Sequence, residues 1–162
     1  PRQNLPNVAG QVLAGHVRKG GYVLAEAPEP RAILVATGSE VSLAMAAFQA
    51  LCALGIPTRV VSMPCTNVFD RQSEAYQEMI LPMDLPAVAI EAAHPDFWRK
   101  YVGRTGVVVG IASFGESAPA PDLYRHFGLT AERVVDAVRT LVHRATHRSE
   151  QPLPEPIVPG TH

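Results

Sequence analysis

The chain has 162 residues and a mass of 17.4 kDa, a length that suits one domain with short extensions. Hydrophobic residues make up 47% and charged residues 18%, which is a globular rather than a disordered composition. The formal net charge of -1 argues against nucleic acid or an anionic membrane as the main partner, and no apolar run approaches the roughly 20 residues that cross a bilayer.

The cysteines and the first residues of the chain indicate in which cellular compartment the protein is expected. Cys52 and Cys65 are the only cysteines, too few for a disulfide framework or for a zinc site built from CxxC pairs. The opening PRQNLPNVAG lacks the basic and then apolar layout of a signal peptide. We therefore expect a cytoplasmic protein and assign no metal ligands.

The first third of the chain predicts a connector, two strands and a helix. Glycines interrupt residues 1–20, which we interpret as a connector. Residues 21–26 (GYVLAE) predict an edge strand, and residues 31–37 (RAILVAT) form an apolar, β-branched run typical of a strand covered on both faces. After a short turn, residues 41–54 predict a nearly all-apolar helix, which Gly55 ends as a left-handed cap.

The middle third continues the alternation of strands and helices. Residues 58–63 (TRVVSM) predict a strand that stops at a proline. Residues 71–81 predict an amphipathic helix with Asp70 as its N-cap. Residues 87–91 predict the next strand, and residues 95–101 a short helix with proline in its first turn.

The last third ends in a long helix and a tail. Residues 106–113 (GVVVGIAS) predict a strand, and residues 121–127 a short helix. Thr130 is the expected cap of a long helix over residues 131 to about 145, whose valines and leucine recur at helical spacing. The proline-rich residues 149–162 predict an extended tail.

This order of elements predicts the fold class. Strands that alternate with helices favour an α/β fold, here a three-layer α/β/α domain over residues 21–148. We expect a mostly parallel five-stranded sheet with one antiparallel edge strand. The order of the strands within the sheet does not follow from the sequence.

One candidate site is the turn after the second predicted strand. In such sheets ligands gather at the carboxyl ends of the strands, where helix N-termini meet the crevice. Backbone N–H groups at Gly38 and the hydroxyl of Ser39 could there hold a phosphate or a carboxylate. The alternative is an ordinary tight turn, because the GxGxxG and Walker spacings are absent and Glu40 would repel an anion.

A second candidate is the loop at residues 114–119 (FGESAP), which follows the last predicted strand. Glu116 and Ser117 could contact a ligand or a neighbouring subunit at this place. Alternatively, the two side chains satisfy backbone donors within an irregular turn.

Three further features allow a functional and a structural interpretation. Cys65 is either a nucleophile or a structural thiol, and no neighbouring motif supplies a base. His143 and His147 lie four residues apart on the last helix, where they either bind a metal or form part of a solvated face. Glu91 and His94 could form an acid–base pair, although the following proline favours a helix start.

Four segments in order carry a family resemblance: ATGSEVSL at 36–43, RVVSMP at 59–64, KYVG at 100–103 and FGESAP at 114–119. Together they closely resemble the C-terminal domain of transketolase. RQNL at 2–5 is similar to the passage from that enzyme's pyrimidine-binding domain into its C-terminal domain.

The resemblance implies a three-domain homodimeric enzyme that transfers a two-carbon ketol unit between sugar phosphates. It also implies thiamine diphosphate and a divalent metal, Mg²⁺ or Ca²⁺. In the family a GDG…N segment of the first domain holds the diphosphate and a glutamate of the second domain activates the pyrimidine ring, and both are absent from this chain. The arginine of the family's RQNL segment helps to bind the substrate phosphate, and Arg2 matches it. The resemblance assigns no catalytic residue to this chain.

We therefore expect a domain that is inactive alone, binds no cofactor alone, and serves packing on the remaining domains of the same polypeptide, dimerisation or regulation. One alternative is a free-standing α/β module that binds a small anionic regulator at residues 37–40. Another is an interaction domain whose apolar faces await a partner. A third is the C-terminal domain of a related thiamine enzyme, over which FGESAP and RQNL favour transketolase.

Overall fold

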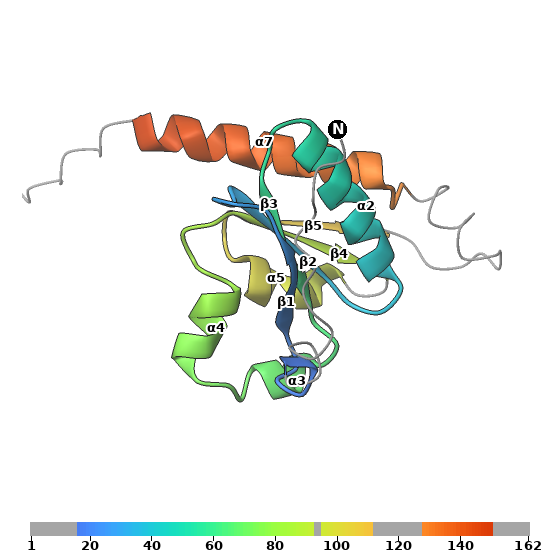
Figure 1. Cartoon of the computed structure of the whole chain (residues 1–162), viewed down its shortest axis with the longest axis vertical. Helices are drawn as coiled ribbons and strands as arrows, with labels where there is room; N and C mark the ends of the chain where they lie inside the picture. The colour runs from blue at the N-terminus through green and yellow to red at the C-terminus, as the bar shows by residue number, and fades with distance from the viewer. Residues whose placement is uncertain (1–15, 93–94, 112–127, 151–162) are drawn as a thin grey trace, which may run out of the picture.

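A twisted sheet lies at the centre of the computed structural model, which describes residues 16–92, 95–111 and 128–150 (Figure 1). Its five strands in the described residues are β1 (Tyr22–Glu26), β2 (Ala32–Ala36), β3 (Thr58–Ser62), β4 (Ala87–Glu91) and β5 (Val107–Gly110). They are ordered β1-β3-β2-β4-β5, with β1 antiparallel to β3 and every other pair parallel. The predicted mostly parallel sheet with an antiparallel edge strand is confirmed.

Helices cover both faces of this sheet. They are α2 (Glu40–Ala53), α3 (Thr66–Phe69), α4 (Glu74–Ile80), the 3₁₀ helix η1 (Pro95–Trp98), α5 (Arg99–Val102) and α7 (Ala131–Glu150). Figure 1 shows α2 and α7 on one side of the sheet and α3, α4 and α5 on the other. Two separate apolar clusters fill the spaces between these layers, which confirms the three-layer α/β/α fold.

The central strand β2 shows why the sheet forms. All five of its residues are buried, because helices lie on both faces and neighbouring strands on both edges. Ile33 and Val35 point into the cluster beneath α4 and α5, whereas Leu34 and Ala36 point toward α2 and α7. A continuous apolar run is what this doubly covered position requires.

Helix α2 follows the prediction closely. It begins at Glu40, one residue before the predicted start, and buries Ala44, Phe48 and Leu51 against the sheet. Gly55 adopts a φ of +74°, and its N–H donates to the carbonyl oxygen of Cys52 at 3.1 Å. The expected left-handed glycine cap is confirmed.

The predicted helix over residues 71–81 is wrong in its start. Within this region the structure has only α4, which begins at Glu74, because α3 already ends at Phe69. The N-cap of α4 is Ser73 rather than Asp70. The Ser73 hydroxyl accepts a hydrogen bond from the backbone N–H of Tyr76 at 3.2 Å. Ser and Asp cap helices equally well, so local sequence could not decide between them.

The last helix is longer than predicted. The hydroxyl of Thr130 accepts from the N–H of Arg133 at 3.2 Å, which confirms the expected cap. Helix α7 then continues to Glu150, past the predicted end near residue 145 and past the predicted start of the tail at residue 149. The predicted helix at 121–127 lies outside the described residues.

Candidate functional site

A cavity of about 480 Å³ lies at the carboxyl ends of β2, β3 and β4, where ligands bind in parallel sheets. Its lining comes from the end of β4, the residues that follow β2 and β3, the first residue of α3, and η1: Thr37, Met63, Pro64, Cys65, Thr66, Glu91, Phe97 and Trp98. None of these described lining residues is basic. The cavity therefore offers apolar surface and a carboxylate, but no lining cation for a phosphate.

Glu91 and Trp98 form the polar contact of this cavity. The indole Nε1 of Trp98 donates to the carboxylate of Glu91 at 2.6 Å. Trp98 is 2% exposed, whereas its neighbour Phe97 is 52% exposed at the rim. The ring of Trp98 also packs against that of Tyr101, with centroids 5.5 Å apart, which fixes the indole in place.

The turn that carries Gly38 and Ser39 uses its own donors. The N–H of Glu40 donates to the carbonyl oxygen of Thr37 at 3.2 Å, and the N–H of Val41 to that of Gly38 at 3.3 Å. The Ser39 hydroxyl donates to the carboxylate of Glu40 at 3.1 Å. These contacts are those of a tight turn, and an anion site at Gly38 and Ser39 stays a prediction.

Glu40 has a special place in the turn that carries Gly38 and Ser39. Its side chain is only 6% exposed although it is charged, and it lies in the first turn of α2. A carboxylate at the N-terminus of a helix is stabilised by the helix dipole. A carboxylate in this first turn would repel an external anion at the same helix N-terminus.

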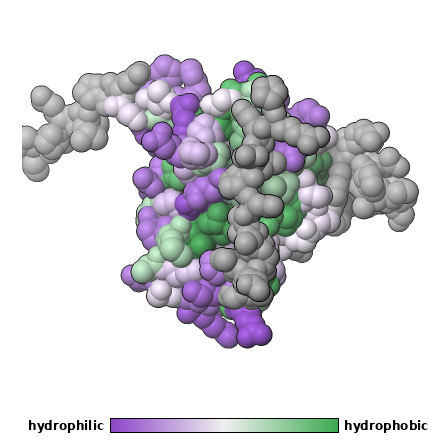
Figure 2. Space-filling view, in the orientation of Figure 1, coloured by the Kyte–Doolittle hydropathy of each residue, from purple (hydrophilic) through white to green (hydrophobic). Residues whose placement is uncertain are grey.

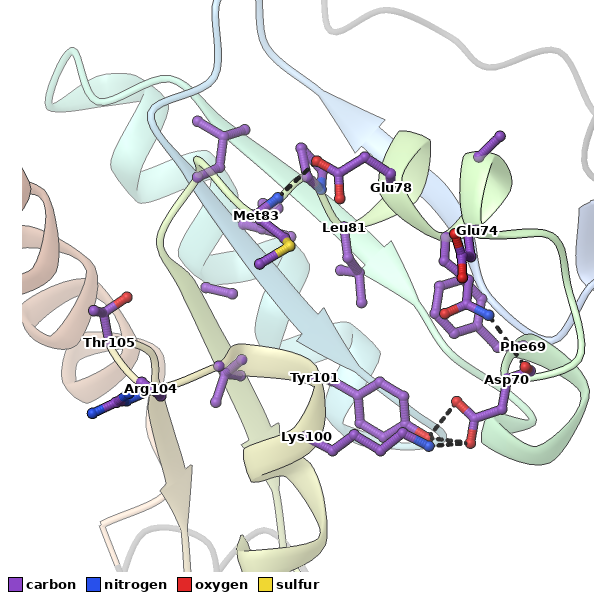
Figure 3. Close-up of a pocket in the computed structure, with 18 residues that line it drawn as sticks. Phe69, Asp70, Glu74, Glu78, Leu81, Met83, Lys100, Tyr101, Arg104 and Thr105 are labelled. Atoms are coloured by element: carbon purple, nitrogen blue, oxygen red, sulfur yellow. Dashed lines mark hydrogen bonds and ion pairs between the residues drawn. The ribbon is translucent and has the colours of Figure 1, made fainter.

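A larger cleft of about 860 Å³ lies on the α4 and α5 side of the sheet, toward the amino ends of β2 and β4 (Figure 3). Phe69 and Leu81 point into it, and Met83 at its edge is 90% exposed. Figure 2 shows hydrophobic surface in the middle of the view with hydrophilic groups around it. Of the candidate anion site, whose residues are described, neither Gly38 nor Ser39 lines this cleft.

A polar cluster closes one end of this cleft. The carboxylate of Asp70 accepts from Nζ of Lys100 at 2.6 Å and from the hydroxyl of Tyr101 at 3.1 Å (Figure 3). Burial raises the pKa of Tyr101, and the hydrogen bond to Asp70 raises it further. The hydrogen bond with Asp70 likewise raises the pKa of Lys100. Asp70 therefore lies at the end of α3 and joins it to α5, instead of capping the N-terminus of α4.

The other sequence candidates are placed as follows. Cys65 is exposed at the start of α3, and His143 and His147 are exposed on α7 with ring centroids 4.2 Å apart. His94 lies outside the described residues, so its expected pairing with Glu91 stays a prediction.

Comparison with known proteins decides the family. Residues 20–130 match the family described as the transketolase-like TK C-terminal domain. The chain belongs to the transketolase family as its C-terminal domain. The predicted family resemblance is therefore confirmed.

Relatives of this transketolase domain are much longer than the chain. The chromosomal transketolase of Cupriavidus necator is 51% identical over 129 residues, which cover 80% of this chain and 19% of that protein. The transketolase structure from Leishmania mexicana has a TM-score of 0.75 at 43% identity, again over 80% of this chain and 19% of that one. The chain spans about a fifth of the length of the relatives it matches.

Two further solved transketolases are relevant. The Pichia stipitis transketolase in complex with sedoheptulose 7-phosphate has a TM-score of 0.73 and 37% identity over 80% of this chain and 19% of that one. A structure described as a split gene transketolase, inactive β4 tetramer, has a TM-score of 0.55 and 27% identity over 78% of this chain and 43% of that one.

The transketolase assignment bears on the remaining predicted residues. Arg2, Glu116 and Ser117 lie outside the described residues, so their roles stay predictions. Within residues 16–92, 95–111 and 128–150, no three His, Cys, Asp or Glu side chains are grouped to hold a metal ion. Among the helices of the same part of the chain, none combines the length and apolar character that a bilayer span requires.

Proposed function

We propose that this chain is the C-terminal domain of an enzyme that transfers a two-carbon ketol unit from a ketose phosphate to an aldose phosphate. The observation that carries the proposal is the family match over residues 20–130. The Pichia stipitis relative crystallised with a sugar phosphate supports that substrate class. We assign the activity to the whole polypeptide, because the chain spans only about a fifth of its relatives.

The cofactors would be held by other parts of the whole enzyme. The resemblance implies thiamine diphosphate with Mg²⁺ or Ca²⁺, which are hard cations that take oxygen ligands. The chain has no GDG…N segment for the diphosphate, and its described residues group no three metal-ligating side chains. The described residues do not fit the cofactor, and we derive no chemical step through it in this domain.

The role that we assign to the domain is packing on the rest of the enzyme, including its dimer. Met83, which is 90% exposed, lines the cleft between α4 and α5 together with Leu81 and Leu85. A contiguous exposed apolar patch is typical of a surface that another domain covers. The split-gene relative described as an inactive β4 tetramer supports an inactive, self-associating fragment.

The test compares the isolated chain with the whole polypeptide in a ketol-transfer assay. We expect turnover by the whole protein with thiamine diphosphate and Mg²⁺, and none by the 162-residue chain. Circular dichroism must show that the isolated chain is folded, so that inactivity reports missing residues. Turnover by the isolated chain would contradict its assigned role, and no ketol transfer by the whole protein would overturn the activity.

Arg2 is the residue that we propose for substrate phosphate binding in the whole enzyme, because a guanidinium pairs with phosphate in two hydrogen bonds. Loss of a charge-assisted pair costs about 1.5–3 kcal/mol, so Arg2→Gln should raise KM for phosphorylated substrates by roughly 10- to 100-fold. KM for an unphosphorylated donor should not change. An equal rise for both kinds of substrate would exclude phosphate recognition as the role of Arg2.

A further inference from the structure

His143 and His147 are one helical turn apart on α7, outside both cavities. Their ring centroids are 4.2 Å apart, and the ring planes are inclined by 76°. Both residues are exposed to solvent. Residues four apart lie on the same face of a helix, and this short separation shows that the two side chains converge.

Converging imidazoles have the geometry of a chelating pair. Two nitrogens that share one ion at a Zn–N distance of about 2.0–2.1 Å are roughly 3 Å from each other. With ring centroids 4.2 Å apart, the two imidazoles are close enough for rotated side chains to reach one ion together. We propose that His143 and His147 form a two-histidine site for a late first-row divalent ion, Zn²⁺, Ni²⁺ or Cu²⁺.

The chemistry of the ligands selects the ion. Neutral imidazole suits zinc, nickel and copper, with Cu²⁺ bound most tightly in the usual affinity order. Mg²⁺ and Ca²⁺ take oxygen ligands, so this pair is unrelated to the metal that accompanies thiamine diphosphate. Both histidines are exposed, so water can reach an ion bound between them.

Nearby charges limit the affinity. Arg144 and Arg148 each follow one of the histidines in the chain, and successive helical residues are about 100° apart around the axis. The arginines therefore lie on an adjacent face, where they do not block the ion but repel it. With two ligands and this repulsion, we expect weaker binding than at four-ligand structural zinc sites.

An ion bound by this pair would hold the end of α7. Residues 143–149 are all exposed, so the last turns make few contacts with the core and are the part of the helix that opens most easily. Because the chelating geometry exists only when this turn is helical, binding favours the helix. We therefore expect the ion to raise the helix content of the chain.

The experiment titrates the untagged 162-residue chain with ZnCl₂ and CuCl₂ by calorimetry, with circular dichroism as a second readout. Loss of a group that merely hydrogen-bonds a metal ligand costs roughly 10- to 100-fold in affinity, so His143→Ala and His147→Ala should each weaken binding at least about tenfold. His16→Ala removes a histidine elsewhere and should bind like the wild type. The increase in helix content should disappear in both α7 variants.

A spacing control separates geometry from histidine count. The double variant Ala145→His/His147→Ala keeps two histidines on α7 but sets them two residues apart, on nearly opposite sides of the helix. It should bind as weakly as His147→Ala. The proposal is overturned if this double variant binds like the wild type, or if neither single α7 variant weakens binding.

Discussion

Arg59 donates two hydrogen bonds to the same carboxylate oxygen of Glu26, from Nε at 2.8 Å and from Nη2 at 2.6 Å. The two residues are register partners on β3 and β1. The remaining nitrogen, Nη1, donates to the carbonyl oxygens of Met79 and Ile80 at the end of α4. One guanidinium thus joins the edge strand, the inner strand and a helix C-terminus.

This relationship predicts a large effect of substitution at Arg59. Hydrogen bonds to charged groups contribute about 1.5–3 kcal/mol, so Arg59→Ala should lower the free energy of unfolding by about 2–3 kcal/mol. Arg59→Lys keeps the charge but loses the planar fork, and we expect a loss of about 1–2 kcal/mol. Urea unfolding measures both losses. The control is Arg99→Lys at an exposed position, which should change the free energy of unfolding by close to zero. An Arg59→Lys variant as stable as the wild type would contradict this account.

Much of the fold is predictable, because the apolar runs and the turn residues indicate the same bounds for the strands and helices. The strand at 87–91 has the predicted bounds, and α2 begins and ends within one residue of its prediction. The spacing of apolar residues did not predict the end of α7, because the large apolar side chains stop at Val142 but the helix continues to Glu150. Arginine and alanine sustain a helix without burial, and basic side chains suit its C-terminus.

The contacts at the candidate sites are less predictable, because they depend on partners far apart in the sequence. The succession of strand, turn and helix along the chain indicates that residues 37–40 lie at a carboxyl edge of the sheet, but not that the Glu40 side chain is buried at the start of α2. The local sequence around Asp70 suits a helix N-cap. Only its contact with Lys100, thirty residues away, shows that it joins two helices. The cleft between α4 and α5 likewise arises from tertiary packing.

The contact between Glu91 and Trp98 predicts a second stability effect. Glu91→Leu would leave the buried indole N–H of Trp98 without this acceptor, at a cost of about 1–3 kcal/mol. Glu91→Gln keeps a carbonyl oxygen that can accept this hydrogen bond, so this variant should lose less of the free energy of unfolding. Trp98 is the only tryptophan, so its fluorescence during urea unfolding reports the change directly. Equal stability of the Leu and Gln variants would show that the hydrogen bond contributes nothing.

The two cysteines should react at different rates with a thiol reagent. Cys65 is exposed, whereas Cys52 is half-buried and burial raises the pKa of its thiol. A raised pKa lowers the thiolate fraction at a given pH, and the thiolate is the reacting form. Labelling with Ellman's reagent at about pH 8 should show a fast and a several-fold slower phase.

The assignment of the labelling phases can be checked by substitution. Cys65→Ser should remove the fast phase and Cys52→Ser the slow one. In denaturant the two rates should become similar, since burial is lost. A single phase in the folded wild-type chain would contradict the structural difference between the two thiols.

Tyr101 predicts a loss of stability at high pH. Burial is the first cause that raises its pKa above the ordinary value of 10.0, and the hydrogen bond and negative charge of Asp70 add to it. The folded state therefore binds this proton more tightly than the unfolded state. The resulting stability is fully present below pH 10.0 and is lost as the pH rises through the raised pKa.

Substitution of Tyr101 tests this window. Tyr101→Phe removes the hydroxyl that donates to Asp70, and we expect a loss of about 1–2 kcal/mol near neutral pH. Above pH 10.0 the variant should lose stability less steeply than the wild type, because one linked proton is gone. The pKa of Lys100 is also raised by Asp70, so Lys100→Met is needed to separate its contribution in the same alkaline range. If the free energy of unfolding falls with pH at the same slope in Tyr101→Phe and in the wild type, the proton of Tyr101 is not linked to folding.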